Sequence, residues 1–243
     1  MKLRYERKYL VKNELLEGLR NRILPFVRAD IFASDSSSDF PEYTVRSIYL
    51  DTANFDALYE KIEGLKERKK LRIRGYNNYI EGCEVFLEIK RKLGNRIAKN
   101  RALTNFDLLQ QSLDLGEIYP KKSSERMMND ASKFFFNYKT KNQKPVNIVV
   151  YDREPYHGKF DPGVRITFDK NIRAALFPQL SDLYSNEGLD LVWKEHFILE
   201  IKYFEGGMPS WAKSIVKEFA LKHEALSKYA AVFNNRDISV YQQ

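Results

Sequence analysis

Charged residues recur at alternate positions in five segments of the chain. The sets are Glu6/Lys8, Arg72/Arg74, Glu88/Lys90/Lys92, Arg165/Asp169 and Glu200/Lys202. Side chains two positions apart on a β-strand point to the same face, so each set would line one surface while the apolar residues between them face the other. A surface rich in Arg and Lys with a few carboxylates suits a polyanion and a metal ion bound with it.

The segment 70–76 carries two arginines on one expected strand face. Arg72 and Arg74 would lie about 7 Å apart by strand rise. At that spacing two guanidinium groups can each bind a phosphoryl group through paired hydrogen bonds. Alternating arginines also occur on solvent-exposed faces of antiparallel sheets, which is the simpler interpretation of this pair taken alone.

The pattern Glu-x-Lys occurs three times within strand-like sequence, beginning at Glu6, Glu88 and Glu200. Ion pairing across an exposed sheet is one explanation. A carboxylate among cations also has a use when the ligand is a phosphate chain, because Mg²⁺ or Mn²⁺ takes hard oxygen ligands while Arg and Lys neutralise the remaining charge. These three glutamates are therefore the predicted metal ligands.

Hydrophobic periodicity and turn residues predict the elements that would position these side chains. Strands are expected over residues 4–11, 43–51, 69–76, 84–92, 146–153, 164–169, 172–176, 189–193 and 196–204. Helices are expected over residues 12–24, 55–60, 124–136 and 211–223, and from Thr104 onward. About eight or nine strands interrupted by helices indicate an α+β fold. Because the charged faces would converge, we expect a closed barrel with a polar interior.

Length, composition and charge limit the class of protein. The 243 residues suit one domain over residues 1–243, and 41 Lys and Arg against 33 Asp and Glu give a formal charge of +8 that favours anionic partners. No stretch approaches the roughly 20 apolar residues that cross a bilayer. The charged first residues predict no secretory signal, and Cys83, the single cysteine, allows no internal disulfide. A cytoplasmic location is expected.

Motifs for several other chemistries are absent from the sequence. It contains no P-loop, no dinucleotide-binding fingerprint and no Gly-x-Ser-x-Gly elbow. Three histidines and one cysteine do not make a convincing zinc site. The aromatic residues fall where a β-rich core needs them, so nucleic acid is not an expected partner.

Eight short segments together carry a family resemblance. They are RYERKY at 4–9, RSIYLD at 46–51, KLRIRGY at 70–76, FLEIK at 86–90, YDR at 151–153, VRITFD at 164–169, ILEIK at 198–202 and LSKY at 226–229. In this order they resemble the VTC domain, the polyphosphate polymerase branch of the triphosphate tunnel metalloenzymes. The resemblance runs from residue 4 to about residue 232.

This resemblance implies an antiparallel eight-stranded β-barrel with flanking helices, a triphosphate tunnel. ATP would bind there with Mn²⁺ or Mg²⁺ and donate its γ-phosphate to a growing polyphosphate chain. The catalytic cations would be Lys8, Arg72, Arg74, Lys90, Arg153 and Arg165. Lys202 and Lys228 would bind phosphate, Arg46 and Lys92 are further candidates for that role, and Tyr49 would contact the nucleotide. Glu200 would be the leading metal ligand, with Glu88 and Glu6 beside it.

The first segment departs from the wider superfamily. Hydrolases and cyclases of the tunnel group typically begin with Glu-x-Glu-x-Lys, whereas this chain has Arg4 before Glu6 and Lys8. Fewer carboxylates imply one metal ion rather than two, which favours the polymerase branch. The family can also carry a second lysine three residues before the position of Lys228, where this chain has Ala225.

Two alternatives stay open at this point. One is a triphosphatase of the same fold that hydrolyses inorganic triphosphate or a nucleoside triphosphate. The other is a non-catalytic sensor or scaffold that binds polyphosphate. The sequence does not define the preferred metal, the oligomeric state or the direction of chain growth. Polymerases of this type can couple synthesis to transport through membrane-spanning segments, and such coupling would require a membrane partner.

Overall fold

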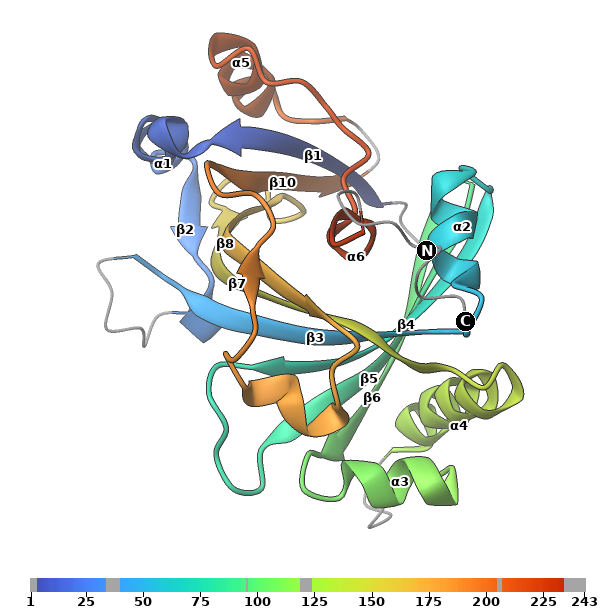
Figure 1. Cartoon of the computed structure of the whole chain (residues 1–243). Coiled ribbons are helices and arrows are strands. Elements are labelled where there is room, and N and C mark those ends of the chain that lie inside the picture. The colour runs from blue at the N-terminus through green and yellow to red at the C-terminus, as the bar shows by residue number, and fades with distance from the viewer. Residues whose placement is uncertain (1–3, 34–39, 95, 119–123, 205–206, 234–243) are drawn as a thin grey trace. The chain divides into compact units, whose positions relative to one another are not determined.

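A computed structural model of the chain describes residues 4–33, 40–94, 96–118, 124–204 and 207–233 (Figure 1). Antiparallel strands with flanking helices confirm the α+β class. The chain divides into two compact units. Unit 1 comprises Met1–Thr44, Tyr151–Arg173 and Leu191–Ser227, and unit 2 comprises Val45–Val150, Ala174–Asp190 and Lys228–Gln243.

Unit 1 is built on an antiparallel sheet in which β10 lies between β1 and β8. Its elements are β1 (Arg4–Lys12), η1 (Asn13–Leu15), α1 (Leu16–Ile23), β2 (Val27–Ala29), η2 (Ile31–Ala33), β10 (His196–Phe204) and α5 (Ser210–Glu218). Strand β2 pairs with the last residues of β7. Two long strands, β7 (Lys144–Gly158) and β8 (Arg165–Leu176), each begin in one unit and end in the other.

Alternation along these strands gives the unit 1 sheet an apolar face and a polar face. Tyr9 of β1 and Leu199 of β10 are buried in one cluster with Leu19 of α1 and Ile215 of α5, and both helices lie beside β1 in Figure 1. Burying each large apolar side chain stabilises the unit by roughly 1.5–3 kcal/mol. The residues between them, including Glu200, must then point to the polar face.

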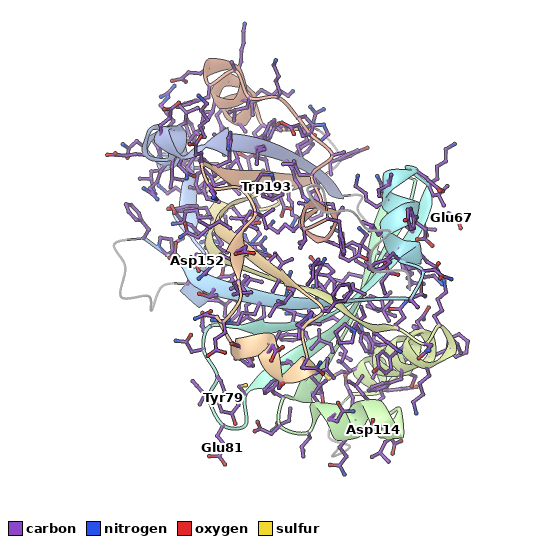
Figure 2. The ribbon with its side chains drawn as sticks, in the orientation of Figure 1. Glu67, Tyr79, Glu81, Asp114, Asp152 and Trp193 are labelled. Atoms are coloured by element: carbon purple, nitrogen blue, oxygen red, sulfur yellow. The ribbon has the colours of Figure 1, made fainter. Side chains whose placement is uncertain are left out.

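Unit 2 contains an antiparallel sheet in the order β3-β4-β5-β6. Its elements are β3 (Tyr43–Asp51, within this unit from Val45), α2 (Asp56–Ile62), β4 (Glu67–Tyr76), β5 (Glu84–Leu93), β6 (Arg96–Asn105), α3 (Leu109–Leu115), α4 (Glu125–Thr140), η3 (Leu180–Tyr184) and α6 (Lys228–Ala231). A short strand, β9 (Asp190–Leu191), has its first residue in unit 2 and its second in unit 1. Glu67 and Tyr79 lie near the two ends of β4 (Figure 2).

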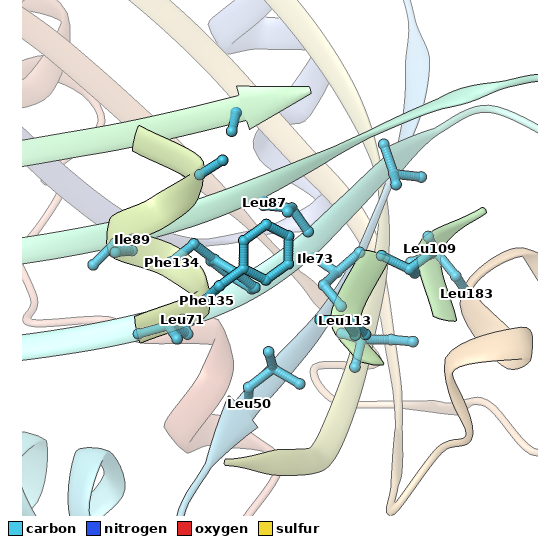
Figure 3. Packing of buried hydrophobic residues seen from close by; sticks show 14 of the residues in the cluster. Leu50, Leu71, Ile73, Leu87, Ile89, Leu109, Leu113, Phe134, Phe135 and Leu183 are labelled. Carbon is cyan, nitrogen blue, oxygen red and sulfur yellow. The ribbon is translucent and has the colours of Figure 1, made fainter. Parts of the chain in front are cut away.

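Helices α3 and α4 cover the apolar face of the unit 2 sheet. Leu71 and Ile73 of β4 and Leu87 of β5 pack in one buried cluster with Leu113 of α3 and Phe134 of α4 (Figure 3). Because side chains alternate along a strand, the residues between these leucines and isoleucines project from the opposite face of the sheet. The hydrophobic core thereby determines which charged residues share the polar face.

Most predicted elements are present, but two strands, β2 and β6, were not predicted. The strand predicted over 43–51 coincides with β3, while the helix expected from Thr104 begins only at Leu109. The segment before it, Arg96–Asn105, is the strand β6, which pairs with β5 along its whole length. Its sequence is mostly polar, so backbone pairing rather than hydrophobic pattern defines it. Residues 172–176, expected as a separate strand, belong to β8.

The closed eight-stranded barrel stays a prediction. Among the described residues, the strands of neither unit pair into a closed ring. The described part of the chain also contains no helix that is long and apolar enough to span a membrane.

Candidate functional site

In unit 1, two lysines and two glutamates form one ion-pair network on the polar face of β1 and β10. The register sets Glu6 opposite Lys202 and Lys8 opposite Glu200. Lys8 Nζ lies 3.0 Å from Glu6 Oε1 and 3.7 Å from Glu200 Oε2. Lys202 Nζ lies 3.6 Å from Glu6 Oε2 and also contacts Glu200 Oε1. Each carboxylate therefore contacts both ammonium groups.

This network has the donors that a hard divalent cation takes. The side chain of Glu6 is 14% exposed, whereas that of Glu200 is 6% exposed and belongs to a buried residue. The hydroxyl Oγ1 of Thr167, across from Glu200 on β8, is buried and has no hydrogen-bond partner among the described residues. No three His, Cys, Asp or Glu side chains group into a metal site within the described ranges. Two carboxylates nevertheless fit Mg²⁺ or Mn²⁺, which can complete their shell with water and phosphate oxygens.

Two arginines of unit 1 are held by aspartates. Arg153 Nε and Nη2 donate to the two carboxylate oxygens of Asp169 at 2.6 and 2.8 Å, and both residues are buried. Burial alone would lower the pKa of Arg153, but the Asp169 carboxylate holds it well above its ordinary value. Arg165 Nη2 donates to Asp30 Oδ2 at 3.1 Å and to the Tyr43 hydroxyl at 3.3 Å. Both guanidinium groups are thus fixed in position.

In unit 2, the polar face of the sheet gathers cations around one buried carboxylate. Arg72 Nε of β4 donates to Glu88 Oε2 at 2.7 Å, while Lys99 Nζ and Arg101 Nε of β6 lie 2.5 and 3.1 Å from Glu88 Oε1. Burial would raise the pKa of Glu88, but the surrounding cations, Arg72 foremost, hold it below its ordinary value. Glu88 therefore stays ionised and orients three cations.

Residues of β3 support the arginines of β4. Arg72 Nη1 donates to the Tyr49 hydroxyl at 3.3 Å, and Arg74 Nε donates to Ser47 Oγ at 3.1 Å. Burial would raise the pKa of Tyr49, yet the charges of Arg72 and Arg74 bring it below its ordinary value. The two guanidinium groups are held on the same strand face, as the sequence predicted for a strand at this position.

Three lysines extend this face of the unit 2 sheet. Lys70 of β4 lies opposite Lys90 of β5, and Lys92 lies opposite Arg68. Lys70 Nζ lies 4.5 Å from the centre of the Tyr229 ring. Burial, together with the charge of Arg68, lowers the pKa of Lys70 to about 7. One cation of this face therefore titrates near neutral pH.

Helix α6 begins at Lys228, and the second residue of this helix, Tyr229, contacts β3. The hydroxyl of Tyr229 donates to Asp51 Oδ2 at 2.5 Å, and its ring centre lies 5.3 Å from that of Tyr49. The same aspartate accepts a hydrogen bond from the backbone N–H of Ala57 in α2 at 3.0 Å. Asp51 therefore ties α2 and α6 to the end of β3.

Arg46 lies on the other face of β3 from Tyr49. Its guanidinium nitrogens donate to the carbonyl oxygens of Asn77 and Ser185 and to Asn186 Oδ1, at 2.8 to 3.0 Å. The residue is 2% exposed. The structure thus places this predicted phosphate ligand apart from the cationic face formed by β4 and β5.

The predicted site residues fall into two groups, one in each unit. Unit 1 contains Glu6, Lys8, Arg153, Arg165, Glu200 and Lys202, and unit 2 contains Arg46, Tyr49, Arg72, Arg74, Glu88, Lys90, Lys92 and Lys228. Sequence reasoning missed Lys70, Lys99 and Arg101. The last two could have been found by the same signal as Arg72 and Arg74, namely cations separated by one residue, had β6 been recognised as a strand.

The chain is similar to a known protein family and to proteins of known structure. A family model described as the VTC domain matches residues 3–234. No curated protein matches the chain significantly. Among solved structures, a Bacillus halodurans protein described as a candidate adenylate cyclase is similar, with a TM-score of 0.53 and 14% sequence identity over 96% of this chain and 98% of that chain. At this identity the likeness concerns the fold alone. Because the family model spans nearly the whole chain, the protein belongs to the VTC-domain family.

Proposed function

We propose that this protein is a metal-dependent polyphosphate polymerase, a phosphotransferase that moves the γ-phosphate of ATP onto inorganic polyphosphate. The observation that carries the proposal is the cationic face of unit 2, where Arg72, Arg74 and Lys90 project from adjacent strands. Membership in the VTC-domain family supports it. We also propose that residues 1–243 form a single domain. Arg4, in place of a first carboxylate, favours transfer over hydrolysis.

The unit 2 residues are proposed to bind phosphoryl groups. Arginine binds phosphate oxygens through paired, charge-assisted hydrogen bonds, and lysine acts as a point charge. Lys228 and Lys92 are proposed to add positive charge, and Tyr49 to contact the nucleotide. Glu88 contacts three cations already, so we assign it to positioning these cations rather than to the metal. Arg46, with its guanidinium bound by three oxygens, is assigned a structural role.

The unit 1 residues are proposed to hold the metal and further phosphate. Glu200 and Glu6 supply the carboxylates, and Lys8 and Lys202, which contact them, bind phosphate. When bound, Mn²⁺ or Mg²⁺ neutralises phosphate oxygens and stabilises the charge that develops during transfer. Lysine side chains are flexible, so their ammonium groups can follow a change of ligand at the carboxylates.

The proposed reaction needs no covalent intermediate with the protein. A terminal oxygen of the polyphosphate attacks the γ-phosphorus of ATP, the bond from this phosphorus to the β–γ bridging oxygen breaks, and ADP leaves. The catalytic cations proposed for binding and stabilising the phosphoryl groups are Lys8, Arg72, Arg74, Lys90, Arg153 and Arg165. Their contribution is positioning and charge stabilisation, which dominate catalysis of phosphoryl transfer.

The function is tested by the product formed from ATP and Mn²⁺. We expect a polymer whose bridging phosphates are detected by phosphorus NMR. Glu200→Ala and Arg74→Ala should each lower the rate of polymer formation by about 100-fold or more. The matched controls are Glu195→Ala, which removes an exposed negative charge next to β10, and Lys69→Ala, which removes an exposed positive charge on β4. Both variants should retain the rate.

The other outcomes of this assay identify the alternatives. ADP and free phosphate without polymer would replace the proposal with a triphosphatase of the same family. Tight polyphosphate binding without turnover would indicate a sensor or scaffold. We also propose a cytoplasmic location, supported by ATP as the substrate and by the free thiol of Cys83.

A further inference from the structure

The polar face of β8 contains a buried threonine hydroxyl, Thr167 Oγ1, that forms no hydrogen bond with the described residues. Thr167 is 1% exposed, and within the part of the chain that the structure describes its Oγ1 has no hydrogen-bond partner. The great majority of buried side-chain polar atoms in proteins are paired, and an unpaired one costs about 1–3 kcal/mol. A hydroxyl held in this state beside a candidate metal site points to a ligand.

The β8–β10 register places Thr167 directly opposite Glu200. Directly opposed residues in an antiparallel pair project to the same face, with Cβ atoms about 4.5–5.5 Å apart. A hydrogen bond from the hydroxyl to the carboxylate would satisfy both groups, yet it is not formed. The Glu200 carboxylate instead contacts the ammonium groups of Lys8 and Lys202. The hydroxyl of Thr167 and the carboxylate of Glu200 are therefore neighbours that form no hydrogen bond with each other.

The charged residues on either side of Thr167 are held by other groups. Asp169 binds Arg153 through both carboxylate oxygens, and Arg165 donates to Asp30. These contacts use rigid guanidinium groups with fixed directions. Glu200 is held by lysines, whose side chains can move, so its carboxylate is the one beside Thr167 that can accept a new ligand.

We propose that the hydroxyl of Thr167 and the carboxylate of Glu200 together bind the divalent cation. The role of this cation in catalysis rests on the function proposed above. Hydroxyl and carboxylate oxygens are hard ligands of the kind that Mg²⁺ and Mn²⁺ take. A Ser or Thr hydroxyl holds Mg²⁺ in the same manner in P-loop nucleotide hydrolases. Thr167 is then a metal ligand that neither sequence pattern nor family resemblance identified.

Phosphate is the other ligand that a threonine hydroxyl could bind. The position opposite Glu200 favours the cation, because a carboxylate at this distance attracts a cation and repels a phosphate oxygen. Burial of the hydroxyl strengthens this preference, since charge interactions are screened less at buried sites than in water.

The test measures Mn²⁺ binding by the whole chain without nucleotide, by electron paramagnetic resonance of free Mn²⁺ and by calorimetry. Thr167→Val removes the hydroxyl and keeps the shape, and it should raise the Kd for Mn²⁺ about tenfold. Thr167→Ser should stay within about twofold of the unchanged protein. Thr104→Val is the matched control, since Thr104 is also a buried strand threonine but lies 3.4 Å from Ser112 Oγ.

Thr167→Val should keep its melting temperature or raise it, because it removes an unpaired buried hydroxyl from a strand. Thr167→Ala is a second variant without the hydroxyl and should show the same loss of Mn²⁺ affinity. Equal Mn²⁺ affinity in the valine variant and the unchanged protein would overturn the proposal, and so would an unchanged protein that binds no Mn²⁺. A valine variant that loses metal-free polyphosphate binding but keeps Mn²⁺ affinity would identify a phosphate ligand instead.

The polymer assay separates this inference from the proposed function. A protein that makes no polymer but binds Mn²⁺ through the Thr167 hydroxyl would keep the metal site and discard the polymerase. A protein that makes polymer with undiminished Mn²⁺ affinity in Thr167→Val would keep the polymerase and discard Thr167 as a ligand.

Discussion

The two units arrange charge differently on the polar faces of their sheets. In unit 1, Glu6 and Glu200 share two lysines, whose side chains are partly exposed. In unit 2, the carboxylate of Glu88 is fully buried and contacts Arg72, Lys99 and Arg101. The unit 1 network therefore has as many flexible cations as carboxylates, whereas in unit 2 one buried carboxylate contacts three cations.

This difference separates two uses of the same residue type on a strand. A carboxylate whose ammonium partners are flexible and partly exposed can exchange them for a metal ion, because the released lysines can be solvated. A buried carboxylate that contacts three cations cannot be removed from them without leaving uncompensated charge. Glu-x-Lys patterns that look alike in the sequence thus fit a metal ligand in one unit and a structural anchor in the other.

The largest expected effect is the loss of stability in Glu88→Ala. Removing this carboxylate leaves Arg72 close to two other cations without its anionic partner, and it should lower the free energy of unfolding by about 3–5 kcal/mol. Glu6→Ala in unit 1 should cost about 1 kcal/mol or less, because its partners can be solvated. Urea denaturation followed by circular dichroism measures both values.

Glu84→Ala is the control for this comparison, because Glu84 is an exposed residue of the same strand. Equal destabilisation by Glu88→Ala and Glu6→Ala would show that the two carboxylates are not used differently. That result would remove the reason for assigning Glu88 to positioning rather than to the metal.

A smaller effect is expected from Tyr229→Phe, which tests how α6 is held in unit 2. The variant removes the hydrogen bond to the Asp51 carboxylate and should cost about 1.5–3 kcal/mol. Because the neighbouring Lys228 begins the same helix, the affinity for polyphosphate should also fall a few fold. Denaturation and polyphosphate titration measure the two effects.

Tyr79→Phe is the matched control for this variant. Tyr79 also donates to an aspartate, Asp107, at 2.9 Å, but this bond is exposed, so its loss should cost about 0.5 kcal/mol. If Tyr229→Phe costs no more than Tyr79→Phe, the Asp51 contact does not hold the helix.

The sequence predicted the strands whose apolar residues alternate and failed where tertiary pairing decides. β3, β4 and β5 follow their hydrophobic patterns closely. The polar strand β6 was missed, because pairing with β5 stabilises it, and the cation partners Lys99 and Arg101 were missed with it.

Strand pairing also explains what was found and missed at the site itself. Alternation already separates Arg46 from Tyr49, since they lie three positions apart on β3. That Glu6 lies opposite Lys202 and that Thr167 lies opposite Glu200 depends on register between distant segments, which one sequence does not contain. Local patterns therefore identify the charged faces, and only the pairing shows which carboxylate belongs with which cation.

The smallest expected effect is a pH dependence that belongs to unit 2. The pKa of Lys70 is lowered to about 7, chiefly by burial. This residue is therefore cationic at pH 6 and largely neutral at pH 8. The lysines of the unit 1 network differ from it because they contact carboxylates. A cation binds phosphate and a neutral amine does not, so polyphosphate affinity should fall as pH rises through about 7, by about threefold.

Lys70→Arg keeps its charge at both pH values and should remove this fall, while Lys69→Arg, at an exposed position on the same strand, should keep it. Calorimetric titration with metal-free polyphosphate at pH 6, 7 and 8 measures the ratio of affinities. A fall of the same size in Lys70→Arg would assign the titration to another group, Lys99 first, because burial lowers the pKa of Lys99 to about 8.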